Sequence, residues 1–341
     1  MFQPAVPIVK VLERIHKSDY VLPAIQREFV WSTEQICRLF DSLMRGYPIG
    51  TFLFWNVEAA NTGNFTFYDF ITDYHEKDAP NASPKQIPVA HGVTAILDGQ
   101  QRLTALNIGL YGSHAERQAR KWQNNPDAYP EKYLYLNLRA GAVDDELGMA
   151  YDFRFLTEEQ AAPVDGRPDS WFRVRDVLKF QNSGPAINSE INRRYLAVLG
   201  DQPFNILWSL YKAVWETPSI NAFLVESQDS DMVLDIFVRV NSGGTALSYS
   251  DLLLSMTTNQ WTTLDAREEV QGLLSKLNVI GSGFRFSKDD VLKAGLVLTD
   301  IGDVGFKVSN FTRQNVISME EKWPKIRESL QIAAEIGRAH V

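Results

Sequence analysis

The chain has 341 residues, of which 45% are hydrophobic and 22% charged, a composition typical of a globular protein with one large or two ordinary domains. The formal net charge of −8 weighs against a surface that holds DNA by bulk electrostatics, although a local basic groove stays open. Cys37 is the only cysteine, which excludes an intrachain disulfide and a thiolate-rich metal site and favours a reducing compartment. There is no leader-like start and no run of about eighteen apolar residues, so we expect a soluble, cytoplasmic protein with no membrane partner.

The sequence lacks the motifs of several common enzyme classes. It contains no GxxxxGKS or GxxxxGKT phosphate loop, no GxGxxG dinucleotide fingerprint and no GxSxG nucleophile elbow. Its histidines form no HExxH pattern and have no asparagine at nuclease-like spacing, which disfavours metal-dependent hydrolysis through a histidine cluster. A lone histidine in a loop is expected to be solvated.

Hydrophobic periodicity and turn signals predict alternating strands and helices followed by a helical region. Ser32 is a suitable N-cap and Gly46 a suitable stop for the second helix, whereas Pro23 restricts its apolar run to an edge strand or an extended segment. The expected elements are helices over 7–16, 33–45, 101–111, 187–215 and 230–240, strands over 21–25, 49–57, 65–70, 93–97, 133–138, 151–156 and 220–225, and helices from Leu252 onwards. The pattern predicts an α+β fold.

The strongest candidate site is the segment Asp98-Gly99-Gln100-Gln101-Arg102, where an apolar strand runs into a helix. A glycine at such a turn lets the backbone approach a ligand, and the free N–H groups of the helix start favour an anion. Arg102 could clamp a phosphate, the two glutamines could recognise a ligand, and Asp98 could hold Mg²⁺ through water or orient Arg102. The alternative is that Asp98 caps the helix and Arg102 pairs with a surface carboxylate.

A second candidate is the pair Gln26-Arg27, which follows the strand with Pro23 and precedes Phe29 and Trp31. A fixed cation and an amide at a strand end could complete a phosphate pocket or position an attacking water. The alternative is an ordinary surface pair beside a core aromatic side chain.

A third candidate follows the predicted helix 230–240, at Asn241-Ser242-Gly243-Gly244-Thr245. Paired glycines can form a backbone nest for an anion, and Asn241, Gly244 and Thr245 could then reach the ligand. The alternative is a helix C-cap followed by the N-cap of the next helix.

Four ordered motifs resemble the N-terminal domain of the GmrSD-type restriction endonucleases, a bacterial family with a ParB/sulfiredoxin-like fold. The pattern P-x-x-QR-x-x-x-W occurs at 23–31 and P-I-G at 48–50. LDGQQRLT occurs at 97–104 and F-x-R-x-N-x-x-G-x-x-L at 237–247. The matches cover roughly residues 5–255, and the DGQQR block is specific by itself.

This resemblance implies a ParB-like nucleotide-binding domain over 1–255 with a variable insertion near 114–185, followed by a helical region over 256–341. It implies that the segment Gly99 to Arg102 holds a nucleoside triphosphate, with Gln26 and Arg27 as further participants in binding or hydrolysis. We expect these segments, and the loop from Asn241 to Thr245, to converge on one site.

The resemblance also implies a function, namely an NTP-binding and NTP-hydrolysing regulatory module of a modification-dependent anti-phage restriction system, with Mg²⁺ as cofactor. DNA is an expected partner, directly or through a partner nuclease. Assembly into a homo-oligomer stays open as an alternative. Many relatives carry a downstream His-Asn-His nuclease domain that is not visible here, so the chain ends before it, cleavage belongs to another protein, or this member lacks cleavage. The alternative functions are a DNA-binding or DNA-nicking domain that uses Asp98, and a non-catalytic interaction scaffold.

Overall fold

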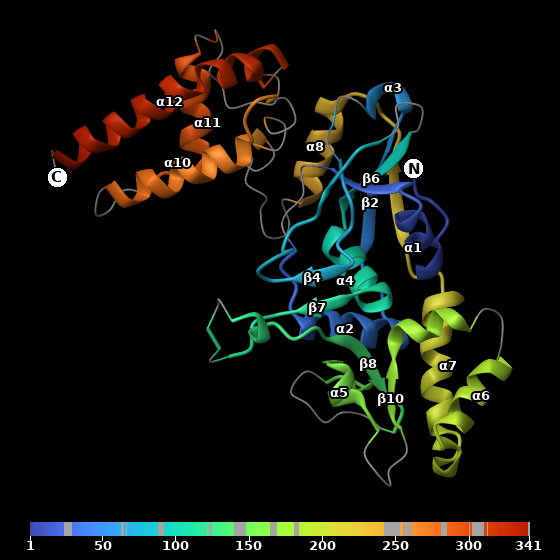
Figure 1. The fold of residues 1–341 in the computed structure, drawn as a ribbon. Helices are drawn as coiled ribbons and strands as arrows, with labels where there is room; N and C mark the ends of the chain where they lie inside the picture. Colours follow the sequence, from blue (N-terminus) through green and yellow to red (C-terminus); the bar gives the residue numbers. More distant parts are fainter. Residues whose placement is uncertain are drawn as a thin grey trace.

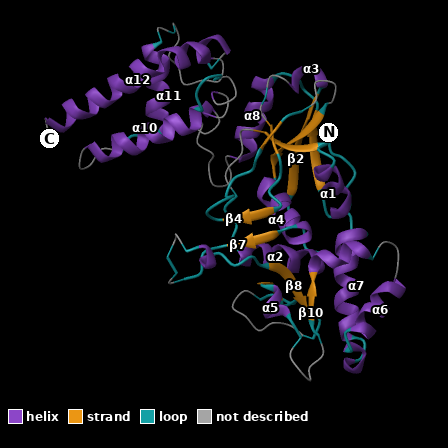
Figure 2. Cartoon of the chain, in the orientation of Figure 1, coloured by secondary structure: helices purple, strands orange, loops and turns teal. Residues whose placement is uncertain are grey.

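A computed structural model provides the structure of the protein. It describes the chain except residues 24–28, 63–64, 66, 88–91, 120, 123–124, 140–147, 164–168, 181–183, 242–252, 255–256, 258–260, 281–284, 300, 302–309, 312 and 340–341. The described residues form an α+β structure with a mixed sheet and a helical C-terminal region, which confirms the predicted fold class (Figures 1 and 2).

A mixed six-stranded sheet lies at the centre of the larger part of the molecule. Its strands, in spatial order, are β11 (Asn221–Val225), β2 (Thr51–Val57), β6 (Val93–Asp98), β1 (Tyr20–Pro23), β3 (Phe67–Tyr68) and β5 (Pro84–Lys85). The β11–β2 and β6–β1 pairs are parallel, and the other neighbouring pairs are antiparallel.

The sequence predicts an edge strand or an extended segment around Pro23, and of these two alternatives the edge strand is wrong, because β1 lies between β6 and β3. Val21 pairs with Ala95 of β6, while Pro23 pairs with Phe67 of β3 on the other side. Proline is tolerated at this internal position because it is the last residue of a short strand, where the missing N–H donor interrupts little of the ladder.

Helices cover both faces of the sheet because alternate side chains of each strand point to opposite faces. Phe52 and Phe54 of β2 join the large core that contains α1 (Ile8–His16), α2 (Thr33–Met44), α4 (Gln100–Tyr111) and α7 (Gln202–Trp215). Leu53 and Trp55 join a second cluster with Val233 and Phe237 of α8 (Ser230–Asn241). Burying each of these large side chains contributes about 2–3 kcal/mol.

Local sequence signals set the ends of these helices. Ser32 accepts a hydrogen bond from the backbone of Gln35 and completes a capping box at the start of α2, and Gly46 follows that helix with a φ of 70°. The predicted helical stretch 187–215 is divided, because Tyr195 and Gly200 have positive φ values.

The region of the predicted insertion packs on the same core as the rest of the α+β part. The ring centroid of Phe153 lies 5.8 Å from that of Phe40 in α2. The smaller elements of the α+β part are β4 (Asp73–His75), β7 (Ser113–Ala115), β8 (Tyr133–Asn137), β9 (Phe153–Leu156), β10 (Trp171–Arg173), α3 (Ala59–Thr62), α5 (Glu158–Ala161), α6 (Gly184–Arg193) and 3₁₀ turns at Pro126–Ala128, Val174–Lys179 and Leu196–Leu199. The predicted domain boundaries, including 255/256, stay predictions.

His114 is an exception to the expectation that lone histidines are solvated. Its side chain is only 2% exposed, between the rings of Tyr74 and Phe155 at centroid distances of 4.6 and 5.5 Å. Among the described residues, neither ring nitrogen has a hydrogen-bond partner. Burial lowers the pKa of His114 to about 4, so the imidazole is neutral at pH 7.

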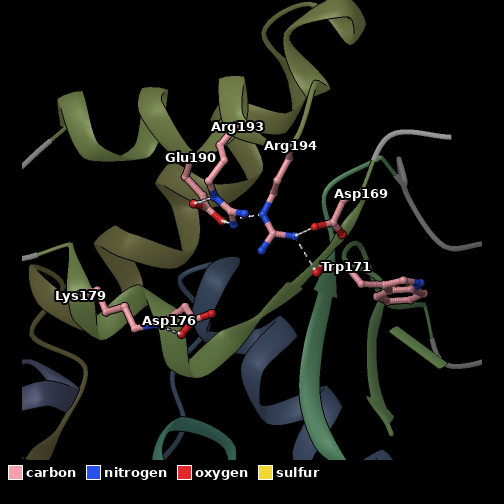
Figure 3. A network of polar contacts seen from close by, with 7 residues as sticks. All are labelled: Asp169, Trp171, Asp176, Lys179, Glu190, Arg193 and Arg194. Carbon is pink, nitrogen blue, oxygen red and sulfur yellow. Dashed lines mark hydrogen bonds and ion pairs between the residues drawn. The ribbon is translucent and has the colours of Figure 1, made fainter. Parts of the chain in front are cut away.

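A buried arginine joins α6 to β10 (Figure 3). Arg194, whose side chain is 7% exposed, donates hydrogen bonds of 2.8 Å to Asp169 Oδ2 and to the carbonyl of Trp171, and one of 2.6 Å to Glu190 Oε1. Burial raises the pKa of Glu190, but the hydrogen bonds from Arg193 and Arg194 outweigh it, and the pKa falls below its usual value. The network fixes the end of α6 against β10, the edge strand of a three-stranded sheet in the order β10-β8-β9.

The C-terminal helices form a separate bundle, drawn in orange and red in Figure 1. It consists of α10 (Ala266–Ile280), α11 (Lys288–Leu298) and α12 (Arg313–Ala339) around their own buried cluster. The rings of Trp261 and Trp323 meet edge to face there, with centroids 5.1 Å apart. Among the described helices, none is long and apolar enough to cross a membrane.

Candidate functional site

The segment Asp98 to Arg102 forms the turn between β6 and α4, as the sequence predicts. Gly99 is the N-cap of α4 with a φ of 91°, and a Cβ atom at this position would overlap the ring of Phe52. The carbonyl of Gly99 accepts a 3.0 Å hydrogen bond from the backbone of Leu103, which starts the helix. Glycine is therefore required both for the left-handed backbone and for the close approach of the phenyl ring.

The guanidinium of Arg102 donates hydrogen bonds to two backbone carbonyls at the start of β2 and to the carboxylate of Asp98. Its Nη1 donates to the carbonyl of Ile49 at 2.5 Å, and its Nη2 donates to the carbonyl of Thr51 at 3.1 Å and to Asp98 Oδ2 at 3.2 Å. The guanidinium carbon lies 4.4 Å from the centroid of Phe52. Burial lowers the pKa of Arg102, and Asp98 opposes that shift. The guanidinium thus ties the turn to the start of β2.

This geometry distinguishes between orientation of Arg102 and capping of α4 as the local role of Asp98. Asp98 pairs with Arg102, and it does not cap the helix, because the N-cap is Gly99 and no side-chain cap is present. The geometry also explains the P-I-G motif, since Gly50 has a φ of 85° and faces the guanidinium of Arg102. Sequence reasoning missed this coupling of two motifs that lie about fifty residues apart.

The two glutamines connect α4 to its surroundings. Gln100 Nε2 donates to the carbonyl of Ile96 at 2.8 Å, and Gln101 Oε1 accepts a 3.0 Å hydrogen bond from the backbone N–H of Val30. The second contact holds the chain just after residues 24–28 against the start of α4. Gln26 and Arg27 themselves lie outside the described residues, so their roles stay predictions.

The third predicted segment is described only at its start. Asn241 is the last residue of α8, and Gly244 and Thr245 lie outside the described residues. Phe237 of α8 shares a buried cluster with Leu97 of β6, which places this helix beside the strand that leads into the turn. Convergence of the 241–245 loop on Asp98 to Arg102 stays a prediction.

A pocket opens beside this turn, on the side of the two glutamines. Its lining includes Gln100, Gln101 and Thr104 of α4, Tyr68 of β3 and Arg267 of α10. The remaining lining residues are Leu22, Phe29, Ile71, Asn81 and Ala82. The pocket combines amide and hydroxyl groups, aromatic walls and a guanidinium, which are groups suited to a polar ligand with an aromatic part.

The sequence analysis includes Thr104 in the LDGQQRLT motif but gives it no role, although it follows Gln100 by one helical turn. Tyr68 and Arg267 come from other parts of the chain, and no local signal indicates that they meet α4. In the described part of the chain, no three His, Cys, Asp or Glu side chains come together as a metal site.

The fold and this turn define a class, an α+β protein whose Asp-Gly-Gln-Gln-Arg segment joins a buried strand to a helix beside a polar pocket. Comparison with known proteins gives the family. The model of the GmrSD restriction endonuclease N-terminal domain matches residues 8–258, which is more than half of the chain, and the protein belongs to this family. This family points to a module of a restriction system.

The chain is also similar to the protein MJ0686 of Methanocaldococcus jannaschii. The two are 24% identical over 254 residues, which is 73% of this chain and 40% of the relative. The chain therefore spans less than half the length of that relative.

Proposed function

We propose that the protein binds a nucleoside triphosphate in the pocket beside the Asp98–Arg102 turn and hydrolyses it, as the regulatory module of an anti-phage restriction system directed at modified DNA. The observation that carries the proposal is that Gln100, Gln101 and Thr104 line this pocket. They belong to the segment on which the family resemblance rests, so the residues singled out by sequence and by geometry coincide.

The start of α4 suits an anionic ligand in that pocket. The first turn of a helix presents unpaired N–H groups and the positive end of the helix dipole. The amides of Gln100 and Gln101 add donors and acceptors, and Tyr68 offers a ring on which a base can stack. Arg102 acts as a positioning residue in this account, because its guanidinium already holds Ile49, Thr51 and Asp98.

Mg²⁺ is the proposed cofactor, and Asp98 is the described residue that would hold it through water. The Asp98 side chain is 34% exposed, with Arg102 on one oxygen. Mg²⁺ bound to phosphates keeps several waters and needs only one or two protein carboxylates, so a single carboxylate is enough. Asp98 is not among the residues that line the pocket, and for this reason the contact to the metal is proposed through water. When bound, the metal neutralises charge that develops on the phosphates. By family resemblance, Gln26 and Arg27 are proposed to take part in hydrolysis.

The test is a binding and hydrolysis panel with the whole chain. Wild-type protein is titrated with ATP, GTP, CTP and UTP in the presence of Mg²⁺, and phosphate release is followed in parallel. Gln101→Ala and Thr104→Val should weaken binding by about tenfold each, since each removes a neutral hydrogen-bonding group. Gln202→Ala, an exposed position at the start of α7, serves as the control. Absence of binding by all four nucleotides would refute the proposal.

A second candidate is suggested by the endonuclease description of the family: the chain itself binds or nicks DNA at Asp98. Incubation with supercoiled plasmid and Mg²⁺ separates the two. Nicking by the wild type that disappears in Asp98→Asn would favour the nuclease, whereas our proposal expects the plasmid to stay supercoiled. A protein that neither binds nucleotide nor nicks DNA would favour the interaction scaffold.

A further inference from the structure

We infer that Arg267, at the start of α10, supplies the cation that binds the phosphates in this pocket, so that the helical region completes the nucleotide site. This inference rests on the proposed function. Arg267 lies beyond residues 8–258, the part of the chain that matches the family. It therefore concerns a residue outside the matched segment, on a different structural unit from the Asp98–Arg102 turn.

Charge is the first argument. Arg267 is the one charged side chain among the described residues that line the pocket. Gln100, Gln101 and Thr104 are neutral, and Arg102 is not among the residues that line the pocket. A triphosphate carries several negative charges, and the chain as a whole has a net charge of −8. A guanidinium that forks onto phosphate oxygens supplies the compensation that the other lining groups lack.

Placement is the second argument. Ala266 and Val270 of α10 are completely buried in the core of the helical region, which fixes the helix on which Arg267 stands. The carboxylate of Asp265 accepts hydrogen bonds from the backbone of Arg267 at 2.8 Å and of Glu268 at 3.0 Å. The first turn of α10 is therefore held in one direction.

The neighbourhood of Tyr68 is consistent with this placement. The pKa of Tyr68 is raised mainly by burial, with a lowering contribution from Arg267 and a raising one from Asp265. The start of α10 thus lies within electrostatic range of Tyr68 in β3. Tyr68, Arg267 and the α4 residues line the same pocket. A ligand between them would contact both structural units at once.

A consequence follows for regulation. Because α10 packs on α11 and α12, a phosphate held by Arg267 would restrain the whole helical bundle relative to the sheet. Nucleotide binding should therefore reduce hydrogen exchange in α10 and not only in α4. Hydrolysis or release would remove that restraint, which is the type of ligand-dependent coupling a regulatory module needs.

The experiment uses the full chain and two ligands, the triphosphate that binds the wild type best and its parent nucleoside. Arg267→Gln should weaken triphosphate binding by about ten- to a hundredfold, as expected for a charged hydrogen-bonding partner, and leave nucleoside binding unchanged. Arg267→Lys should recover part of the loss. Lys276→Gln, the same charge change at an exposed position further along α10, should bind as the wild type does.

Two results would overturn the inference alone. Arg267→Gln could bind the triphosphate as tightly as the wild type, or it could lose triphosphate and nucleoside equally, which would indicate a merely structural role. If instead the wild type binds no nucleotide, the proposed function itself fails and this inference with it. Hydrogen exchange of α10 that is unchanged by bound triphosphate in the wild type would contradict the coupling.

Discussion

A Cβ atom on Gly50 would lie 2.5 Å from Nη1 of Arg102, because the guanidinium reaches past this glycine to the carbonyl of Ile49. The P-I-G and D-G-Q-Q-R motifs are therefore parts of one structural unit, although neither indicates the other by any local pattern. This unit sets the position of the turn between β6 and α4, and with it the polar wall of the pocket.

Gly50→Ala is expected to destabilise the protein by about 2 kcal/mol or more, since it combines an unfavourable left-handed backbone with a steric clash. Gly46→Ala is the matched control, because Gly46 also has a positive φ but no atom of the described chain lies within 4 Å of a Cβ at this position. It should cost only about 1 kcal/mol. Urea unfolding of both variants provides the comparison, and equal losses would contradict the role given to Arg102.

Arg102→Ala should itself cost about 2 kcal/mol, since it leaves Asp98 and two carbonyls without their donor. In the Arg102→Ala background the guanidinium that a Cβ of residue 50 would meet is absent. The double variant should therefore lose about 1 kcal/mol less stability than the sum of the two single losses. Strict additivity in this double-mutant cycle would mean that the two residues do not interact.

Local signals allowed much of the fold to be predicted from the sequence. Ser32 and Gly46 mark the ends of α2 by their own chemistry, and the glycine between Leu97 and Leu103 marks the strand-to-helix turn. The family motifs identified the Asp98–Arg102 segment in the same way, as a contiguous pattern.

The remaining features depend on contacts between distant parts of the chain. The neighbours of β1 on both sides are set by the register of the sheet, which Pro23 alone does not reveal. The burial of His114 depends on Tyr74 and Phe155, and the pocket needs Arg267 from another structural unit. None of these can be read from a single segment, because the sequence pattern reports local periodicity only.

Acid should weaken the protein through His114. Burial lowers the pKa of this histidine to about 4 in the folded protein, against an ordinary value of 6.5, so the unfolded chain binds the extra proton first. The stability contribution is present above pH 6.5 and is lost as the pH falls towards 4, to a total of about 3 kcal/mol. Glu116, Lys132 and Glu76 are the charged groups that act on it.

His114→Phe keeps an aromatic side chain between the same two rings and removes the titrating group. The decrease in the free energy of unfolding between pH 6.5 and 5 should be smaller in this variant than in the wild type. Identical pH profiles would show that His114 is not the responsible group.

The two neighbouring arginines at the end of α6 should differ sharply in their contribution to stability. Arg194→Ala is expected to cost about 3 kcal/mol or more, because it leaves Glu190 and Asp169 partly buried without their partner. Arg193→Ala, at a side chain that is 63% exposed and also pairs with Glu190, should cost less than about 1 kcal/mol. Thermal or urea unfolding distinguishes them, and similar losses would contradict the network as described.

Asp265→Asn should tighten triphosphate binding by about two- to fivefold, because it removes a negative charge beside Arg267 while asparagine still caps the start of α10. The gain should shrink at high salt. Titration at two ionic strengths tests this, and weaker binding at low salt would indicate that Asp265 supports the ligand rather than repels it.

The most direct test is a calorimetric titration of the whole chain with each of the four nucleoside triphosphates in Mg²⁺, beside the Gln101→Ala and Gln202→Ala variants. We predict saturable binding of at least one triphosphate to the wild type, weakened in Gln101→Ala and unchanged in Gln202→Ala. Absence of binding by all four, or binding that Gln101→Ala leaves intact, would contradict a nucleotide site beside the Asp98–Arg102 turn.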